Sequence, residues 1–206
     1  MLTPNRLAVL CSSLLLAVPL TGATRPGPTP EATLRAALAG NEFYVSVEGT
    51  KQGKFKGESV KSQYKDMIQG MAFEWDVTSP RDAATGLPSG KRQYKPITFT
   101  KEWGAASPQL FQALTANELL KTVRFDFIKA NASGAEYIFQ RITLTNASVS
   151  EIRRYVGTVT PAGTSVGNGA PGTARALEDV SFTFASIMLE DLDGKTTASD
   201  NWRAMP

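Results

Sequence analysis

Apolar and polar residues alternate along several stretches of the chain, which is the period-two pattern of half-buried β-strands. The first stretch begins at Phe43 and stops at Gly49, where a glycine interrupts the alternation. A shift in the apolar spacing after Phe139 indicates a β-bulge near Gln140 and Arg141. Further strands are predicted at residues 67–77, 97–100, 122–127, 137–144 and 180–189, with a weaker edge or curved strand at 149–155.

Polar stretches rich in glycine, proline or lysine separate these strands. Loops are predicted at residues 50–61, 80–90 and 161–172, and a hairpin connection at 131–134. The six to eight strands do not alternate with helices along the chain. The pattern therefore predicts a mainly β protein built on a closed or sandwich-like antiparallel sheet.

One helix is predicted, immediately after residue 106. Ser107 is expected to be its N-cap and Pro108 its first helical residue, where the missing N–H of proline has no cost. Leu110, Phe111 and Leu114 form the apolar set expected to face the core.

Composition narrows the classes of function. The 206-residue chain is long enough for one substantial core, and its 42% hydrophobic content is ordinary for a globular protein. Its net charge of +3 is small and its basic residues are scattered, so we expect no nucleic-acid binding. The chain has no histidine, and it therefore lacks the commonest general base and the commonest metal ligand. We expect no cofactor and no metal site.

The N-terminus has the three parts of an export signal. Arg6 supplies the positive charge, residues 7–20 form an apolar run, and the small residues before Thr24 predict cleavage after Ala23. Residues 1–23 are accordingly predicted to be a signal peptide. The alternative is an uncleaved N-terminal anchor, although the apolar run is shorter than the ~20 residues that span a bilayer.

The rest of the chain divides into three parts. Residues 24–40 are predicted to be a Pro-rich linker with a short helix, residues 41–192 a β domain, and residues 193–206 a polar tail. The only cysteine, Cys11, lies in the signal, so the exported chain would have no disulfide bonds.

Three short motifs suggest chemistry, and the first two have a structural explanation. Gly194-Lys195-Thr196 resembles the end of a phosphate loop but lacks its first glycine, and Glu190, Asp191 and Asp193 lack the spacing of a calcium loop. Ser62 and Lys65 have the spacing of a Ser–Lys catalytic pair, which keeps an enzyme open as a third class of function.

The stretch KRQYKPITFTKEWGAASP, residues 91–108, resembles the core signature of the haemolysin-coregulated protein (Hcp) family, the tube subunits of type VI secretion. The likeness continues in order at residues 43–49, 73–77, 123–144 and 178–182. The residues of the signature that we single out as candidates for assembly are Lys91, Arg92, Lys95, Pro96, Lys101, Ser107 and Pro108.

The resemblance implies an antiparallel β-barrel of two sheets with one flanking α-helix. It also implies hexameric rings that stack into a hollow tube, contacts with the secretion apparatus or with effector proteins, and no enzymatic activity. In the family the loop at 80–90 helps to join neighbouring rings or subunits.

The export signal departs from the family, whose members normally leave the cell without one. It implies a periplasmic or extracellular protein with no stable membrane insertion after cleavage. An exported monomeric binding module that kept the fold and lost the assembly remains the alternative.

Overall fold

The computed structural model describes residues 42–131, 133–160, 163–166 and 174–202. The predicted signal peptide, the linker, part of the predicted loop at 161–172 and the last four residues lie outside this part of the chain.

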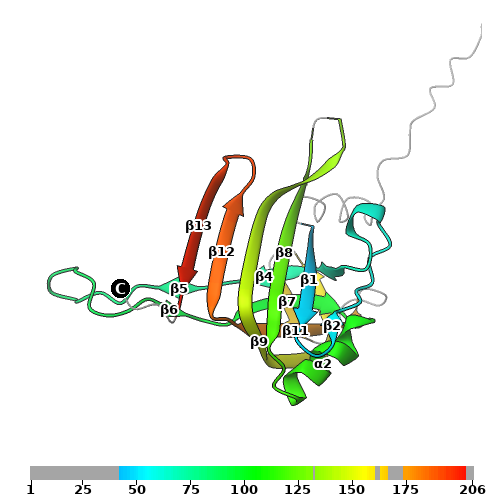
Figure 1. Cartoon of the computed structure of the whole chain (residues 1–206), viewed down its shortest axis with the longest axis horizontal. Coiled ribbons are helices and arrows are strands. Elements are labelled where there is room, and N and C mark those ends of the chain that lie inside the picture. Colours follow the sequence, from blue (N-terminus) through cyan, green and yellow to red (C-terminus); the bar gives the residue numbers. More distant parts are fainter. Residues whose placement is uncertain (1–41, 132, 161–162, 167–173, 203–206) are drawn as a thin grey trace, which may run out of the picture.

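Two antiparallel sheets share the long strand β9 (Figure 1). Sheet A contains β2 (Gly53–Lys54), β1 (Phe43–Gly49), β3 (Ile68–Gly70), β8 (Leu120–Ala130), β9 (Glu136–Thr160), β12 (Ser186–Asp191) and β13 (Thr196–Asn201). Sheet B contains β4 (Ala72–Glu74), β7 (Ile97–Glu102), β11 (Arg175–Thr183), the second half of β9 and β10 (Gly163–Val166). The mainly antiparallel β fold, with one α-helix among the described residues, confirms the predicted fold class.

The core lies between the two sheets and consists of the apolar residues of the alternating stretches. Phe99 of β7 stacks on Phe182 of β11 and meets Phe125 of β8 edge-on, with ring centroids 5.9 and 5.8 Å apart. None of the three rings is exposed. The alternation therefore identified the buried face of each of these strands correctly.

The barrel is not closed as the resemblance implied. The predicted strand at 67–77 is broken at Met71, so that β3 pairs with β1 in sheet A and β4 pairs with β7 in sheet B. Met71 itself donates its N–H to the Thr100 carbonyl at 2.8 Å. The two sheets are thus joined at this side by a bend in one segment and not by a continuous hydrogen-bonded ladder.

The predicted strand at 180–189 is also two strands. It turns at Phe184 and Ala185, so that β11 ends in sheet B and β12 begins in sheet A. Ala185 bridges the sheets by donating its N–H to the Thr145 carbonyl at 3.2 Å. Strand β9, in contrast, runs unbroken, and its second half is the curved edge predicted at 149–155. A bulge at Phe139 lies next to its predicted place.

Helix α2 (Ala106–Thr115) packs beside β9, but its first turn differs from the prediction. The N-cap position is Ala105, and Ser107 lies within the first turn, where its hydroxyl is buried. Leu110 faces the core as predicted, whereas Phe111 is 53% exposed. No helix in the described part of the chain is both long and apolar enough to cross a membrane.

The predicted loop at 80–90 is the tip of a hairpin that projects away from both sheets (Figure 1). We call residues 77–94 the arm. It contains β5 (Val77–Thr78) and β6 (Gln93–Tyr94), which pair only with each other, and an isolated bridge between Arg81 and Pro88.

Candidate functional site

The candidate residues of the 91–108 stretch divide between two settings. Lys91, Arg92, Lys95 and Pro96 lie at the base of the arm, where Lys91, Lys95 and Pro96 are exposed. Lys101 and Ser107 lie inside the body of the protein, and both are buried. Pro108 is exposed, but it lies on α2 and not at the base of the arm. The structure therefore does not bring the seven residues together into one surface.

Lys95 and Asp76 form an ion pair where the two strands of the arm leave the body. The two side chains lie 2.5 Å apart, and the Lys95 N–H donates to the Asp76 carbonyl at 3.1 Å. The hydrogen bond to Asp76 raises the pKa of the Lys95 ammonium above its ordinary value. With 72% of its side chain exposed, Lys95 is available to a neighbouring molecule.

Arg92 joins the arm to the C-terminal strand. Its Nη2 donates to one carboxylate oxygen of Asp200 at 2.5 Å and to the Asn201 carbonyl at 2.8 Å, and its Nε donates to the other oxygen of Asp200. The Tyr94 hydroxyl donates to the same carboxylate. Burial alone would raise the pKa of Asp200, but the hydrogen bonds from Arg92 and Tyr94 outweigh it and hold that pKa below its ordinary value.

Aromatic rings pack beside this ion pair. Tyr94 lies between Trp75, whose ring is stacked at 6.4 Å, and Trp202, whose ring is 6.0 Å away. Phe184 contacts both Tyr94 and Trp202 edge-on. The N–H of Trp202 donates to the Ala185 carbonyl at 2.9 Å, which fixes the end of β13 to the turn between β11 and β12.

The second half of the stretch forms a buried network of charges. Lys101 Nζ lies 3.2 Å from a Glu178 carboxylate oxygen and 3.3 Å from Glu58, and it donates to the Ser107 hydroxyl at 3.1 Å. Only 1% of the Lys101 side chain and none of the Glu178 side chain is exposed. A buried ammonium of this kind requires such partners, because an unpaired charge in the interior is costly.

Ser107 and Arg154 complete the network on the side of Glu178. The Ser107 hydroxyl donates to Glu178 at 2.6 Å and accepts the Gly104 N–H at 3.0 Å. Arg154 Nε donates to the other Glu178 oxygen at 2.9 Å. The network thus ties the first turn of α2 to β7, β9 and β11, which is a structural role.

Sequence reasoning missed several of these residues. Asp200 and Trp202 lie in the stretch predicted to be a polar tail, and Glu58 lies in a predicted loop. A lone aspartate and tryptophan near the end of the sequence carry no signal of a partner 108 residues away. Glu178 lies in the stretch at 178–182 that resembles the family, but this resemblance does not indicate its partners.

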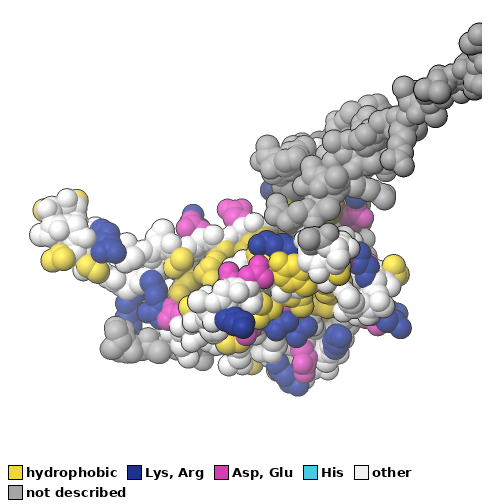
Figure 2. All heavy atoms as spheres, turned by 90° about the horizontal axis from the view of Figure 1, so that it is seen from above, with side chains coloured by type: hydrophobic (Ala, Val, Ile, Leu, Met, Phe, Trp, Pro, Cys, Tyr) yellow, Lys and Arg dark blue, Asp and Glu magenta, His cyan; other side chains and the backbone are white. Residues whose placement is uncertain are grey.

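Outside these two settings, few side chains in the described part of the chain are candidates for catalysis or for metal binding. Ser62 and Lys65 are both exposed at the 3₁₀ helix η2 (Ser62–Tyr64), whereas a catalytic Ser–Lys pair needs a desolvated lysine. Within the described residues, no group of three or more acidic or cysteine side chains could hold a metal ion. Basic and acidic side chains are interspersed on the face seen in Figure 2.

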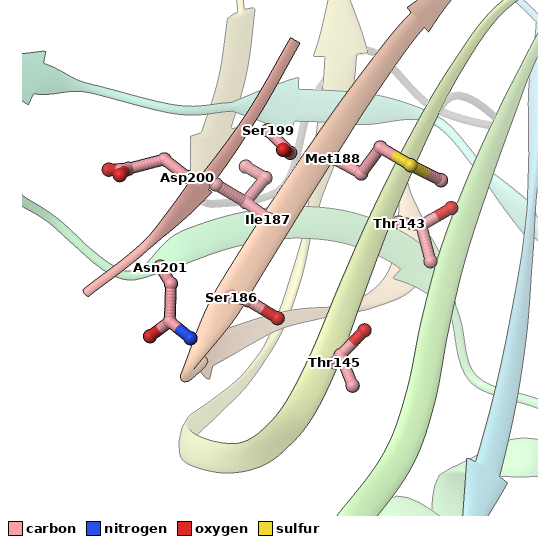
Figure 3. Close-up of a pocket in the computed structure, with 8 residues that line it drawn as sticks. All are labelled: Thr143, Thr145, Ser186, Ile187, Met188, Ser199, Asp200 and Asn201. Carbon is pink, nitrogen blue, oxygen red and sulfur yellow. The ribbon is translucent and has the colours of Figure 1, made fainter. Parts of the chain in front are cut away.

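A pocket of about 360 Å³ lies on sheet A, between β9, β12 and β13. Half of its lining residues carry hydroxyl groups, namely Thr143, Thr145, Ser186 and Ser199, and the other half are Ile187, Met188, Asp200 and Asn201 (Figure 3). It has few of the apolar and aromatic walls that small-molecule sites usually show.

Comparison with known proteins gives consistent matches. The model of the family described as "Type VI secretion system effector, Hcp" matches residues 44–190. The chain is 33% identical over 174 residues to the "Major exported protein" of Pseudomonas aeruginosa. This alignment covers 78% of this chain and 95% of that protein.

Solved structures agree with the sequence matches. The crystal structure of an Hcp protein superposes with a TM-score of 0.68 at 28% identity, covering 78% of this chain and 99% of that one. The secreted protein Hcp3 from Pseudomonas aeruginosa gives a TM-score of 0.60 at 26% identity over 80% of this chain and 99% of its own.

Proposed function

The chain belongs to the Hcp family of type VI secretion, whose members are secreted structural tube proteins and not enzymes, and we propose that it forms hexameric rings that stack into a tube. The match to the family model spans the arm and the strands of both sheets except β13. Head-to-tail contacts between identical subunits close into a ring when each contact includes the same rotation.

The observation that carries this proposal is the arm. It extends beyond the body, its residues 81–90 are all exposed, and Leu87 at its tip is 64% exposed. An isolated two-stranded hairpin is at best marginally stable in water. An arm of this kind is suited to packing against a neighbouring copy, as the resemblance implies for the loop at 80–90.

We assign the candidate residues to two roles within this proposal. Lys91, Arg92, Lys95 and Pro96 belong to the assembly surface at the base of the arm. Lys101 and Ser107 act indirectly, because their buried network holds the body that presents that surface.

Export is the second part of the proposal. Residues 1–23 direct the chain across the inner membrane, and the processed protein acts in the periplasm or outside the cell, where it meets secretion-apparatus or effector proteins. Mass spectrometry of the exported protein should find Thr24 at its N-terminus. A charge in the apolar run, Leu15→Arg, should keep the chain inside the cell.

Light scattering of the exported protein after size exclusion, with negative-stain images of the same fraction, tests the assembly. A mass close to six subunits and hollow rings would support it. A monomer at high micromolar concentration would contradict it and would favour the binding module, for which the pocket on sheet A would be the first site to test.

A further inference from the structure

We propose that the end of strand β13 is a latch that sets the direction of the arm and thereby positions it for contact with the next copy. The latch consists of Asp200 and Trp202, which hold Arg92 and Tyr94 at the base of the arm. This inference rests on the proposed function for its consequence in assembly, but the latch itself can be tested on a single subunit.

The first argument is that the arm has little else to orient it. Its strands β5 and β6 form a separate two-stranded sheet that hydrogen-bonds to neither sheet A nor sheet B. The residues beyond Pro80, up to Gly90, are exposed and bury nothing against the body. The direction of the arm is therefore decided by contacts at its base.

The second argument is the alternation of side chains along β13. Asp200 pairs with Ile187 of β12, and residues paired across antiparallel strands point to the same face of the sheet. Ile187 is buried in the core, so Asp200 points to the core side. On that side Asp200 contacts Arg92 at the base of the arm. Figure 3 shows its carboxylate pointing away from the hydroxyl side chains of the pocket.

The third argument is the geometry of the contact. Arg92 meets both oxygens of the Asp200 carboxylate with two N–H groups, a forked arrangement that fixes orientation as well as distance. Both side chains are 31% exposed, so the pair is partly shielded from water. Asn201 adds its carbonyl to the same guanidinium.

The aromatic contacts turn this ion pair into a rigid joint. Trp202 packs on Tyr94 and on Phe184, and Phe184 belongs to the core. A swing of the arm would therefore separate Tyr94 from Trp202 while it broke the bonds to Asp200. One ion pair alone would permit rotation, and the tilted and edge-on ring contacts of Trp202 restrict it.

The test measures the motion of the arm and the assembly separately. In the full chain with Cys11→Ser, the substitution Leu87→Cys supplies a single thiol at the tip of the arm for a fluorescent label. Asp200→Asn keeps the shape of the side chain and removes its charge, and Asp200→Glu restores the charge. Asp193→Asn, in the turn between β12 and β13, is the control. Fluorescence anisotropy and the rate of tryptic cleavage after Arg81 report on the arm.

We expect Asp200→Asn to lower the anisotropy and to speed cleavage about tenfold, the loss that corresponds to one charged hydrogen bond. Asp200→Glu should recover most of this loss, and Asp193→Asn should leave both readings unchanged. The thermal unfolding midpoint should not change, because the core is untouched. Unchanged cleavage in Asp200→Asn would overturn the latch.

Light scattering of the same Asp200 and Asp193 variants, unlabelled and with Leu87 retained, tests the consequence. If wild-type rings form, Asp200→Asn should reduce the mass of stacked rings while the hexamer remains. A mobile arm with undiminished stacking would overturn the positioning role. If the wild-type protein forms no rings, the proposed function fails, and the anisotropy and cleavage data still decide whether the latch exists.

Discussion

The two halves of the 91–108 stretch place basic residues in opposite environments. Lys95, at the base of the arm, keeps 72% of its side chain exposed and pairs with a carboxylate that is itself 40% exposed. Lys101, six residues later, is buried and is held by Glu178, Glu58 and Ser107. One continuous run of sequence thus serves an exposed surface first and the interior next.

The difference shows that a shared sequence signature does not mark one site. An exposed ion pair contributes little to stability, since water screens it and ordering two long side chains costs entropy. A buried pair is different, because removal of one partner leaves the other charge uncompensated. Substitutions in the buried half should therefore affect folding, and substitutions in the exposed half should affect the proposed contacts between subunits.

The largest expected effect is that of Lys101→Met. This change keeps the length of the side chain and removes its charge, so that Glu178 loses a cationic partner in the core. We expect the free energy of unfolding to fall by about 3–5 kcal/mol, measured by chemical denaturation. In the double variant with Glu178→Gln the loss should be smaller than the sum of the two single losses. Additive losses would show that the two charges do not interact.

A smaller effect, dependent on pH, is expected at Glu118. This buried carboxylate accepts the N–H groups of Lys51 and Gln52 at 2.7 and 2.9 Å and holds the turn after β1. Burial alone would raise its pKa, but these hydrogen bonds outweigh burial and lower the pKa from its ordinary 4.5.

Because the pKa of Glu118 is lower in the folded state, its stabilisation is present above pH 4.5 and is lost as the pH falls through the folded value. Glu118→Gln should therefore lower the free energy of unfolding by about 1–3 kcal/mol at pH 7. The two denaturation curves should converge in more acidic solution. A deficit that stayed constant down to pH 3 would mean that the charge of Glu118 is not what stabilises the turn.

The smallest effect on stability is expected from Lys95→Ala. The side chain is exposed, so the thermal unfolding midpoint should stay within the error of the wild-type value. Differential scanning calorimetry of the Lys95→Ala and Lys101→Met variants compares the two positions directly, since each substitution removes one positive charge from the same stretch. Equal shifts of the unfolding midpoint in the two variants would contradict the distinction between the exposed half and the buried half of the stretch.

The sequence predicted the elements whose pattern is local. The strand at 97–100 and the first strand from Phe43 were recognised because apolar residues alternate along one face, and the structure buries that face. The bend at Met71 was missed because apolar residues alternate from Met71 through Trp75 without a break at the crossing between the sheets. At Ala185 the apolar spacing does shift, between Phe184 and Ile187, but such a shift fits a bulge within one strand as well as a crossing from one sheet to the other. Only pairing with distant strands distinguishes such a bend from a longer strand.

The predicted helix start was wrong, and the contacts of Asp200 were missed, for a related reason. Ser107 followed by Pro108 satisfies a local rule for an N-cap, but Glu178 and Lys101 draw the hydroxyl into the interior. Asp200 has no local pattern at all, and its partner Arg92 is brought to it by the whole intervening fold.

Amide hydrogen exchange, followed by mass spectrometry in the assembled protein and in the dissociated subunit, tests the central distinction most directly. The account predicts that peptides from residues 97–108 are protected equally in both states, because their protection comes from the core. Peptides from residues 79–90 should exchange rapidly in the subunit and become protected only on assembly. Equal protection of the arm in both states, or protection of 97–108 that depends on assembly, would contradict it.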